Sequence, residues 1–334
     1  MTERSLSKLL DRSLTARESL FDPQHETAFR LFNGFTEGCP ELVVDLYGST
    51  VVLNNYAEQP EPGFSLVREA QEFLQTHLIW LRAGIVKTRN GNTQAERRGK
   101  ILFGSNPDHK IKEQDVWYAL DLTMNRDASL YLDTRNLRKW AIENLYGKAV
   151  LNTFAYTGSL GIAALAGGAH RVVQLDANPQ FLNIAKQSYA LNGYPIHEED
   201  FLTEDFFLQV GRFKRAGASF DCVFIDPPFF ATSSKGKVDQ EQDSARLINK
   251  VRPLIKDDGH LVAINNALFV SGRDYMQTLE SLCADGYLKV SGLIPIPPDL
   301  TGYEQTIIGA PITDPAPFNH STKIAVLEVK RKLS

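Results

Sequence analysis

From about residue 130 onward, the sequence alternates short apolar runs with helical stretches, and this alternation constrains the fold more than any other feature. The apolar runs lie at 149–151, 172–175, 220–225 and 260–264, and the helical stretches lie at 134–145, 159–167, 179–192 and 241–256. Strands that alternate with helices in this way form a parallel sheet with helices on both faces. A last pair of predicted strands, 288–293 and 323–329, flanks a long proline-rich connection at 295–318.

The residues before this region follow a different, mixed pattern. The predicted elements are a β-hairpin at 42–47 and 51–53 around Gly48-Ser49, a helix at 64–78, and strands at 85–88 and 116–122. We therefore expect three parts. They are an N-terminal extension at 1–27, a small α+β domain at 28–125, and an α/β domain at 126–334.

Composition and cysteine content exclude several classes of protein. With 43% apolar and 23% charged residues, the chain has the composition of an ordinary globular protein. No apolar run approaches the ~20 residues of a membrane span, and residues 1–17 hold no apolar core of an export signal. Cys39, Cys222 and Cys283 are far apart and form neither a metal-ligand spacing nor a disulfide framework. We therefore expect a cytoplasmic protein with no metal and no membrane partner.

The segment Asp226-Pro227-Pro228-Phe229-Phe230 directly follows the apolar run 222–225. The prolines fix the backbone and stop the strand, so the carboxylate is left at the carboxyl end, and the rings offer flat faces for a planar group. Such an arrangement suits a nucleobase stacked beside a reactive centre. The alternative is a strand end with a rigid turn and no ligand.

Polar residues also follow other predicted strands, and the ligand crevice of an open parallel sheet lies at the carboxyl ends of its strands. Gly158, in the segment 152–158, lets the backbone approach a ligand and precedes a helix that presents its first amides. Asp176 ends the second run, where a carboxylate can accept hydrogen bonds from ribose hydroxyls. We expect Asp200 and Phe201 to follow the third strand, where an acid and a ring could receive an adenine. The alternatives are an ordinary glycine turn and carboxylates that cap helices.

The first of these loops differs from a dinucleotide-binding loop. The residues after Leu151 do not follow the G-x-G-x-x-G pattern, so no close cradle for a pyrophosphate is evident. Phe154 and Tyr156 would crowd a diphosphate, but they suit a ligand without phosphates. S-adenosylmethionine is such a ligand.

Together these motifs resemble a known family. The segments 131–135, 152–158 and 226–229, with Asp176 and Asp200, resemble class I methyltransferases that modify 23S ribosomal RNA, with similarity to the large-subunit enzymes of the I and K/L types. The segment from Arg30 to Gly48 resembles the domain that precedes the catalytic one in that family. The resemblance implies a Rossmann-like, seven-stranded, mostly parallel sheet preceded by a small α+β domain.

The resemblance also implies S-adenosylmethionine as the methyl donor and assigns site residues. The expected donor-binding residues are Asp133, Arg135, Asn152, Phe154, Tyr156, Thr157, Gly158, Asp176, Ala177, Asp200, Phe201 and Asp226. The expected catalytic residues, which face the target base, are Asp226, Pro227, Pro228, Phe229 and Asn265.

The residues after the fifth strand bear on the chemistry of methyl transfer. Carbon-5 methylation of cytosine needs a nucleophilic thiolate, and cytosine-modifying relatives carry a cysteine at this place. This chain has Ile264-Asn265-Asn266-Ala267 instead, a pair of asparagines that resembles the guanine N7-methylating branch. Guanine N7 needs only to be held in line with the methyl group, because its lone pair is already in the ring plane. Methylation of an exocyclic amine is the alternative.

A run of basic residues predicts contacts with RNA. The net charge of −4 excludes a uniformly basic surface but not a local basic groove. The segment 82–100 holds six basic residues against one acid, Glu96. We expect Lys87, Arg89, Arg97, Arg98 and, near the base site, Lys235 to bind RNA phosphates. The alternative is a solvated charged hairpin.

The expected partner is 23S ribosomal RNA, either free or in an assembling large subunit. Type I relatives carry a larger N-terminal RNA-binding module than the segment before residue 28, so the first domain or a partner is expected to recruit the RNA. Two other functions stay open from the residues alone. One is a nicotinamide-dependent oxidoreductase, and the other is a non-catalytic RNA-binding protein with a methyltransferase fold.

Overall fold

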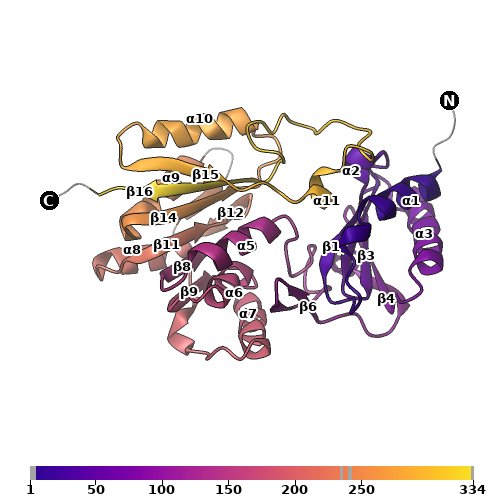
Figure 1. Cartoon of the computed structure of the whole chain (residues 1–334), viewed down its shortest axis with the longest axis horizontal. Coiled ribbons are helices and arrows are strands. Elements are labelled where there is room, and N and C mark those ends of the chain that lie inside the picture. Colours follow the sequence, from indigo (N-terminus) through magenta and orange to yellow (C-terminus); the bar gives the residue numbers. More distant parts are fainter. Residues whose placement is uncertain (1–4, 234–235, 240–242, 332–334) are drawn as a thin grey trace. The chain divides into compact units, whose positions relative to one another are not determined.

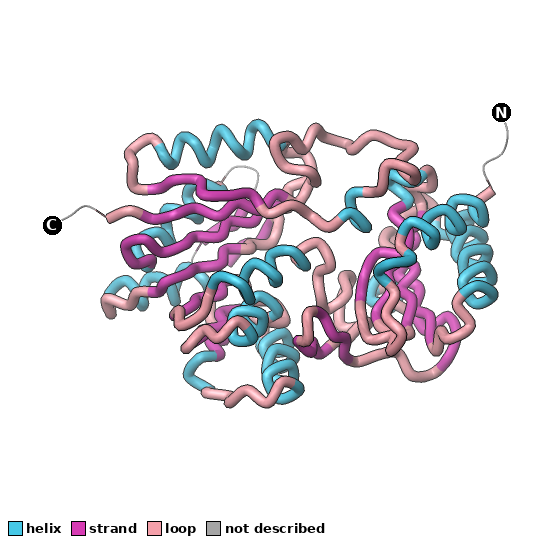
Figure 2. The backbone as a smooth tube through the Cα atoms, in the orientation of Figure 1, coloured by secondary structure: helices cyan, strands magenta, loops and turns pink. Residues whose placement is uncertain are grey.

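The structure, a computed structural model, describes residues 5–233, 236–239 and 243–331. The chain divides into two compact units, whose elements are shown in Figures 1 and 2. The first unit comprises 1–132 and 297–311, and the second comprises 133–296 and 312–334. Part of the proline-rich connection therefore packs with the first unit.

The first unit contains a five-stranded sheet in the order β1-β2-β3-β4-β5. Its neighbouring strands are antiparallel except β3 and β4, which are parallel and are joined by α3. The elements are α1 (Leu6–Ala16), η1 (Glu18–Leu20), β1 (Ala28–Asn33), α2 (Gly34–Glu37), β2 (Leu42–Tyr47), β3 (Thr50–Asn55), α3 (Pro60–His77), β4 (Ala83–Thr88), α4 (Gln94–Arg98), β5 (Lys100–Gly104), β6 (Lys110–Glu113), β7 (Val116–Ala119) and α11 (Pro298–Thr301). The predicted hairpin and helix are confirmed as β2–β3 and α3.

The N-terminal helix is part of the core of this unit. Leu6, Leu9 and Leu10 of α1 are buried in one apolar cluster with residues of α3 and the sheet. Arg17, just after α1, is fully buried and forms an ion pair of 2.9 Å with Glu37. Its guanidinium also donates to the carbonyl of Asp299 at 2.9 Å. These contacts tie both ends of α1 and the segment 297–311 to the first unit.

The second unit contains the seven-stranded sheet, in the order β10-β9-β8-β11-β14-β16-β15. Neighbours are parallel except at β16, which is antiparallel to both β14 and β15. The elements are α5 (Arg135–Asn144), β8 (Ala149–Thr153), α6 (Ser159–Ala166), β9 (Arg171–Asp176), α7 (Pro179–Leu191), η2 (Glu198–Asp200), β10 (Phe201–Thr203), α8 (Phe206–Arg215), β11 (Phe220–Ile225), β12 (Phe230–Ser233), β13 (Gly236–Asp239), α9 (Ser244–Val251), η3 (Arg252–Leu254), β14 (Ile255–Asn265), α10 (Gly272–Cys283), β15 (Leu288–Leu293) and β16 (Lys323–Val329). The predicted fold, a mostly parallel α/β sheet after a small α+β part, is confirmed.

Helices cover both faces of this sheet. Val223 and Ile225 of β11 lie in the apolar core that includes residues of α8, α9 and α10. Phe224, between them in sequence, makes an edge contact with Trp140 of α5 on the opposite face. Burial on both faces explains why the strand reads as a continuous apolar run. The same packing holds the carboxyl end of β11 in place, directly before Asp226.

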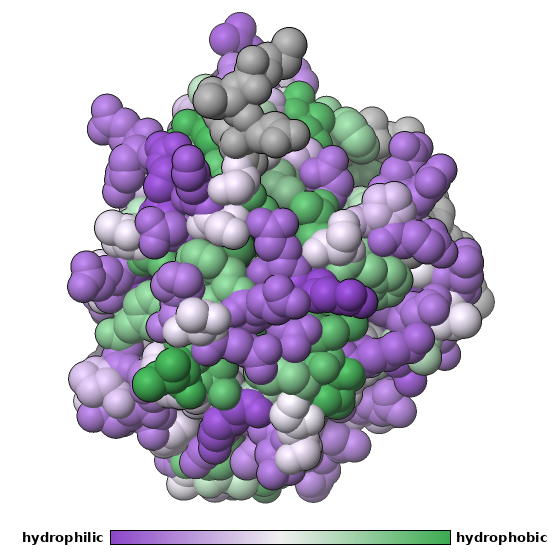
Figure 3. All heavy atoms as spheres, turned by 90° about the vertical axis from the view of Figure 1, so that its right-hand side faces the viewer, coloured by the Kyte–Doolittle hydropathy of each residue, from purple (hydrophilic) through white to green (hydrophobic). Residues whose placement is uncertain are grey.

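One face of the molecule carries mainly polar residues (Figure 3). Figure 3 shows one face of the molecule, on which hydrophilic residues surround smaller hydrophobic areas. Among the described residues, no helix combines the length and the apolar character needed to cross a membrane.

Candidate active site

The order of the strands predicts where a ligand binds. From β8 the chain builds outward to β9 and β10, and it then returns to the other side of β8 to form β11 and β14. The carboxyl ends of these five parallel strands lie at one edge, which we call the carboxyl edge. Ligands of such sheets bind there, beside the strands where the order reverses. These strands are β8 and β11.

The loop after β8 has an unusual backbone. Phe154 and Tyr156 both adopt left-handed conformations, with φ of 54° and 50°. Bulky residues rarely do so, and such strain collects at ligand sites. The ring of Phe154 stacks on that of Phe206 with centroids 4.6 Å apart, and Tyr156 meets Phe181 edge-on at 4.5 Å. The loop is therefore held in one conformation at the carboxyl edge.

Gly158 ends this loop, and its lack of a side chain is required. Its φ is 76°, and a Cβ atom there would lie 2.6 Å from that of Ala185. Asn152 and Thr157 are buried. The amide of Asn152 donates to Gln174 at 2.9 Å, inside the sheet. Asn152, a predicted donor-binding residue, is therefore buried below the loop and hydrogen-bonded within the sheet.

Asp176 ends β9 as predicted and is joined to the loop after β8. Its carboxylate accepts hydrogen bonds from the amides of Tyr156 at 2.9 Å and Asn178 at 2.8 Å. Burial raises the pKa of Asp176, and these amides oppose the rise. Ala177, which follows, is exposed. Asp176 is thus a partly buried, oriented carboxylate at the carboxyl edge.

The predicted position of Asp200 is wrong. Asp200 precedes β10, which spans Phe201–Thr203, and therefore lies at the amino end of that strand. It forms an ion pair of 2.8 Å with Arg171, the first residue of β9. Phe201 is buried and meets Tyr189 edge-on at 4.9 Å. Neither side chain lies where the crevice of a parallel sheet is found.

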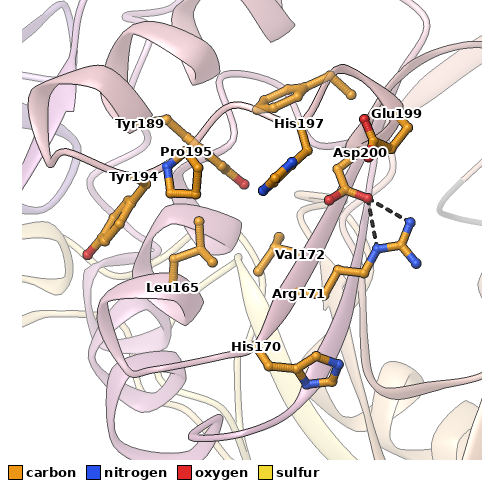
Figure 4. A pocket seen from close by; sticks show the side chains of 11 residues that line it. Leu165, His170, Arg171, Val172, Tyr189, Tyr194, Pro195, His197, Glu199 and Asp200 are labelled. Carbon is orange, nitrogen blue, oxygen red and sulfur yellow. Dashed lines mark hydrogen bonds and ion pairs between the residues drawn. The ribbon is translucent and has the colours of Figure 1, made fainter.

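Figure 4 shows the pocket around this ion pair. Its volume is about 340 Å³, and Tyr194, His197 and Glu199 line it together with Arg171 and Asp200. Arg171 begins β9 and Asp176 ends it. The pocket therefore lies at the amino edge of the sheet, opposite to Asp176.

The carboxyl end of β10 carries residues that the sequence analysis missed. Thr203 pairs with Asp176 across the two strands, so Glu204 and Asp205 follow next to Asp176. Asp205 caps α8 by accepting a hydrogen bond of 3.0 Å from the amide of Leu208. Phe206 then stacks on Phe154. The acid and the ring expected at residues 200 and 201 are thus found at 205 and 206, a second acid–aromatic pair that was available in the sequence.

Asp226 follows β11 and lies near a second carboxylate, Asp133. Burial and the charge of Asp133 raise the pKa of Asp226 to about 7. Asp133 accepts a hydrogen bond of 2.8 Å from the hydroxyl of Thr322. It stands just before α5, whose first residue is the half-buried Arg135. A carboxyl group that titrates near neutral pH is a frequent mark of a functional site.

The motif that begins with Asp226 extends to the surface. Pro227 is buried and Pro228 is exposed, and the side chain of Phe229 is 47% exposed. A ring this exposed beside a titrating carboxyl group is available to a planar ligand.

Asn265 ends β14 at the same edge but is turned inward. It is 1% exposed, its amide donates to the hydroxyl of Ser244 at 3.0 Å, and its oxygen accepts from the amide of Ala267 at 3.0 Å. The next residue, Asn266, is exposed. Asn265 therefore fixes the turn after β14, and the side chain that this turn presents to solvent is that of Asn266.

Two of the predicted RNA-binding residues are internal supports of the first unit. Lys87 is 1% exposed, and its ammonium donates to the carbonyls of Arg98, Asn125 and Asp127 at 2.7, 2.9 and 3.4 Å. Burial lowers the pKa of Lys87 to about 8. Arg89 binds Asp127 at 2.8 Å and lies over the ring of Tyr56. The prediction that Lys87 contacts RNA is therefore wrong, because its ammonium is enclosed.

The other basic residues differ in their surroundings. Arg97 donates to the carbonyl of Gly91 at 3.0 Å and is half-buried, whereas Arg98 and Lys100 are exposed. They lie on and after α4, which begins with a capping box between Thr93 and Glu96. Lys235 lies outside the described residues. Among residues 5–233, 236–239 and 243–331, no group of acids, histidines and cysteines is arranged to hold a metal ion.

Comparison with known proteins relates this chain to methyltransferases. A family model described as S-adenosylmethionine-dependent methyltransferase matches residues 30–300. The ribosomal RNA large subunit methyltransferase I of Aeromonas hydrophila is 31% identical over 221 residues, which cover 65% of this chain and 55% of that protein. The ribosomal RNA large subunit methyltransferase K/L of Psychrobacter arcticus is 30% identical over 281 residues, or 77% of this chain and 34% of that protein. The matched part thus spans about half, or less, of these relatives.

Solved structures share the fold. A protein assigned as a methyltransferase and solved in complex with SAH superposes with a TM-score of 0.83 at 21% identity, covering 97% of this chain and 80% of that one. A methyltransferase from Agrobacterium tumefaciens, described as S-adenosylmethionine-dependent, gives a TM-score of 0.62 at 17% identity, covering 87% and 88%. At these identities the likeness shows the fold alone.

Proposed function

The chain belongs to the S-adenosylmethionine-dependent methyltransferase family, and from this premise we propose that it transfers a methyl group from S-adenosylmethionine to a base nitrogen of large-subunit ribosomal RNA. The observation that carries the proposal is the carboxyl edge of the sheet. There the oriented carboxylate of Asp176 lies beside a strained, aromatic loop, and Asp226 carries a pKa of about 7.

The donor site is built around the ends of β8, β9 and β10. Asp176 binds the ribose hydroxyls, because a half-buried carboxylate held by backbone amides accepts two hydrogen bonds in a fixed direction. The loop of Phe154, Tyr156, Thr157 and Gly158 encloses the donor. The loop lacks the G-x-G-x-x-G pattern, and its two bulky rings would crowd a diphosphate, which fits a donor without phosphates.

The adenine end of the donor is bound at the end of β10. Asp205 accepts the adenine amine, and the half-buried Phe154, backed by the buried ring of Phe206, forms the wall for the adenine ring. These residues take the role expected of Asp200 and Phe201, whose side chains lie at the amino edge. Asp133 and Arg135, at the amino end of α5, complete the donor site near Asp226.

The target is a guanine, methylated at N7. When bound, S-adenosylmethionine supplies an electrophilic methyl group, and the N7 lone pair needs no base to attack it. Phe229 stacks on the ring, and Asp226 and the exposed Asn266 orient its polar edge. The thiol nearest in sequence to Asp226 does not fit cytosine C5 chemistry, because Cys222 is fully buried inside β11 and burial raises its pKa.

Ribosomal RNA is proposed as the substrate because both relatives described above are named for it. The exposed Arg98 and Lys100 supply cations for its phosphates, and Arg97 adds a third. An enzyme with this substrate works in the cytoplasm, where ribosomes assemble.

The test uses 23S ribosomal RNA from cells that lack the gene. The purified protein is incubated with this RNA and S-adenosylmethionine carrying a labelled methyl group, and the nucleosides are then separated and weighed by mass spectrometry. The proposal predicts labelled 7-methylguanosine. Labelled 5-methylcytidine would contradict methylation of a nitrogen. A nucleoside labelled on its exocyclic amine would show that this amine, and not guanine N7, accepts the methyl group. No label in RNA would reject the substrate.

A further inference from the structure

The loop between β14 and α10, residues 266–270, presents apolar side chains to solvent. Leu268 is 37% exposed and Phe269 is 69% exposed. A single exposed apolar residue is ordinary on a protein surface. Two exposed apolar residues in succession on one short loop are less ordinary. Hydrogen bonds fix the backbone of this loop, so both side chains are kept exposed, and this suggests a binding role for them.

A buried lysine holds this loop from beneath. Lys323, the first residue of β16, is fully buried. Its ammonium donates to the carbonyls of Ala267 at 3.0 Å, Val270 at 3.1 Å and Ser321 at 2.6 Å. Burying an ammonium is costly unless it is hydrogen-bonded in this way. The two carbonyls of the loop lie on either side of Leu268 and Phe269, so the lysine fixes both ends of the exposed pair.

Further contacts fix the same loop. Asn265 accepts from the amide of Ala267, and the hydroxyl of Thr313 donates to the carbonyl of Leu268 at 2.9 Å. Gly272 lies so close to the backbone of Pro315 that a Cβ atom would be 1.8 Å from its carbonyl oxygen. The loop is thus a rigid support for exposed apolar groups.

The loop begins at the carboxyl edge, beside the motif of Asp226. Strands β11 and β14 are parallel neighbours, with Ile225 paired to Ala263. Asp226 follows Ile225 directly, and β14 ends two residues after Ala263, so the loop starts at residue 266. Neighbouring strands lie about 4.8 Å apart, so the segments after them leave the sheet side by side.

A cation stands at the end of the loop. Arg273, in the first turn of α10, is exposed. Within the part of the chain that the structure describes, no ion pair occupies its guanidinium. An exposed ring followed by an exposed arginine is the combination with which proteins bind single-stranded RNA, since the ring stacks on a base and the cation meets a phosphate.

We propose that Phe269 stacks on an unpaired base that adjoins the target nucleotide, and that Arg273 contacts the phosphate backbone of the same RNA segment. This inference rests on the proposed function and adds a second base-binding position to it. Phe229 and Phe269 would then hold two successive bases apart, so that the target base stays out of its stack.

The test compares Phe269→Ala with two matched variants. Phe269→Tyr keeps an aromatic face, and Tyr146→Ala removes another exposed ring, 83% exposed, that stands before β8 at the amino edge. Binding is measured by fluorescence anisotropy with a 12-nucleotide single-stranded RNA that carries 2-aminopurine. Affinity for S-adenosylmethionine is measured by calorimetry, and methyl transfer to 23S ribosomal RNA is measured for each variant.

Phe269→Ala is expected to weaken binding of the 12-mer, and to raise KM for ribosomal RNA, by about 5- to 150-fold, the range given by loss of one base–aromatic stack. Donor affinity should stay unchanged, and both Phe269→Tyr and Tyr146→Ala should behave as the unchanged protein does. Equal binding of the 12-mer by Phe269→Ala would overturn the inference while leaving the proposed function intact. If the unchanged protein transfers no methyl group to RNA, the proposed function fails. The affinity of Phe269→Ala for the 12-mer then tests by itself whether Phe269 binds RNA.

Discussion

The carboxylate of Asp176 accepts a hydrogen bond of 2.9 Å from the backbone amide of Tyr156. This bond joins the end of β9 to the loop after β8, in which Tyr156 is held in a left-handed conformation. Because the amide of Asn178 binds the other carboxylate oxygen, the acid cannot rotate freely. The two hydrogen bonds therefore hold the proposed ribose-binding carboxylate in one orientation.

The pKa of Asp226, about 7, predicts the pH dependence of methyl transfer. If the carboxylate orients the base, the reaction requires the deprotonated form, which is present above pH 7 and is lost as the pH falls below it. The rate should fall about tenfold between pH 8 and pH 6. Asp226→Asn should be slow and independent of pH over this range, as measured by kcat/KM for ribosomal RNA. A wild-type profile that is flat from pH 6 to pH 8 would exclude this role.

The same group predicts a change in stability. The folded-state pKa of Asp226 lies above its ordinary value of 3.8, so the unfolded chain releases the proton first and the free energy of unfolding falls as the pH rises from about 4 to 7. Asp226→Asn removes the free-energy cost of ionising this buried carboxyl group in the folded protein. Since one pKa unit corresponds to about 1.4 kcal/mol, the variant should be more stable than the unchanged protein by roughly 4 kcal/mol at pH 8 and about equal to it at pH 4. Denaturant unfolding at the two pH values checks this, and a variant that is less stable at pH 8 would contradict it.

Asp205 allows its two roles to be separated. Its carboxylate caps α8 through the amide of Leu208, and we propose that it also binds the adenine amine. Asp205→Ser keeps a capping oxygen but loses the charge, so it should weaken donor binding about tenfold with little change in thermal stability. Asp205→Ala should lose donor affinity to the same extent and about 1 kcal/mol of stability as well. Equal donor affinity in Asp205→Ser and the unchanged protein would remove Asp205 from the donor site.

Lys87 and Arg98 provide a matched pair of cations in the first unit. Lys87→Met would leave three carbonyls without their donor and should lower the free energy of unfolding by about 2–4 kcal/mol. The slope of RNA affinity against salt should not change in this variant. Arg98→Ala should keep its stability within about 0.5 kcal/mol and reduce that slope by about 0.7. The reverse pattern, with a reduced slope in Lys87→Met alone, would restore Lys87 as an RNA contact.

The sheet could be predicted because its central strands are buried on both faces. The runs that became β8, β9, β11 and β14 are continuous and apolar, and the alternation with helices fixes their parallel direction. Asp176 and Asp226 were therefore correctly expected at strand ends. β10 has only three residues and no such run. With acids on both sides of it, at Asp200 and at Glu204 and Asp205, the pattern does not say which acid lies at which edge.

The inward orientation of Lys87 and Asn265 was not expected, for another reason. Both are polar residues near the carboxyl ends of apolar strands, and the sequence does not reveal whether such a residue turns inward or faces solvent. The carbonyls that enclose Lys87 come from residues 98, 125 and 127, and the hydroxyl that binds Asn265 belongs to Ser244, 21 residues away. Only the fold brings these partners together. The strain at Phe154 and Tyr156 likewise appears only in the backbone angles.

The most direct measurement is calorimetric titration of the purified protein with S-adenosylmethionine, using Asp176→Asn and Asp200→Asn as a matched pair. We predict that the unchanged protein binds S-adenosylmethionine but not NAD. Asp176→Asn should bind at least about tenfold more weakly, since it loses a charged acceptor for the ribose. Asp200→Asn should bind as the unchanged protein does, because its partner is Arg171 at the amino edge. Absence of binding by the unchanged protein, or equal affinity in Asp176→Asn, would contradict the proposed site.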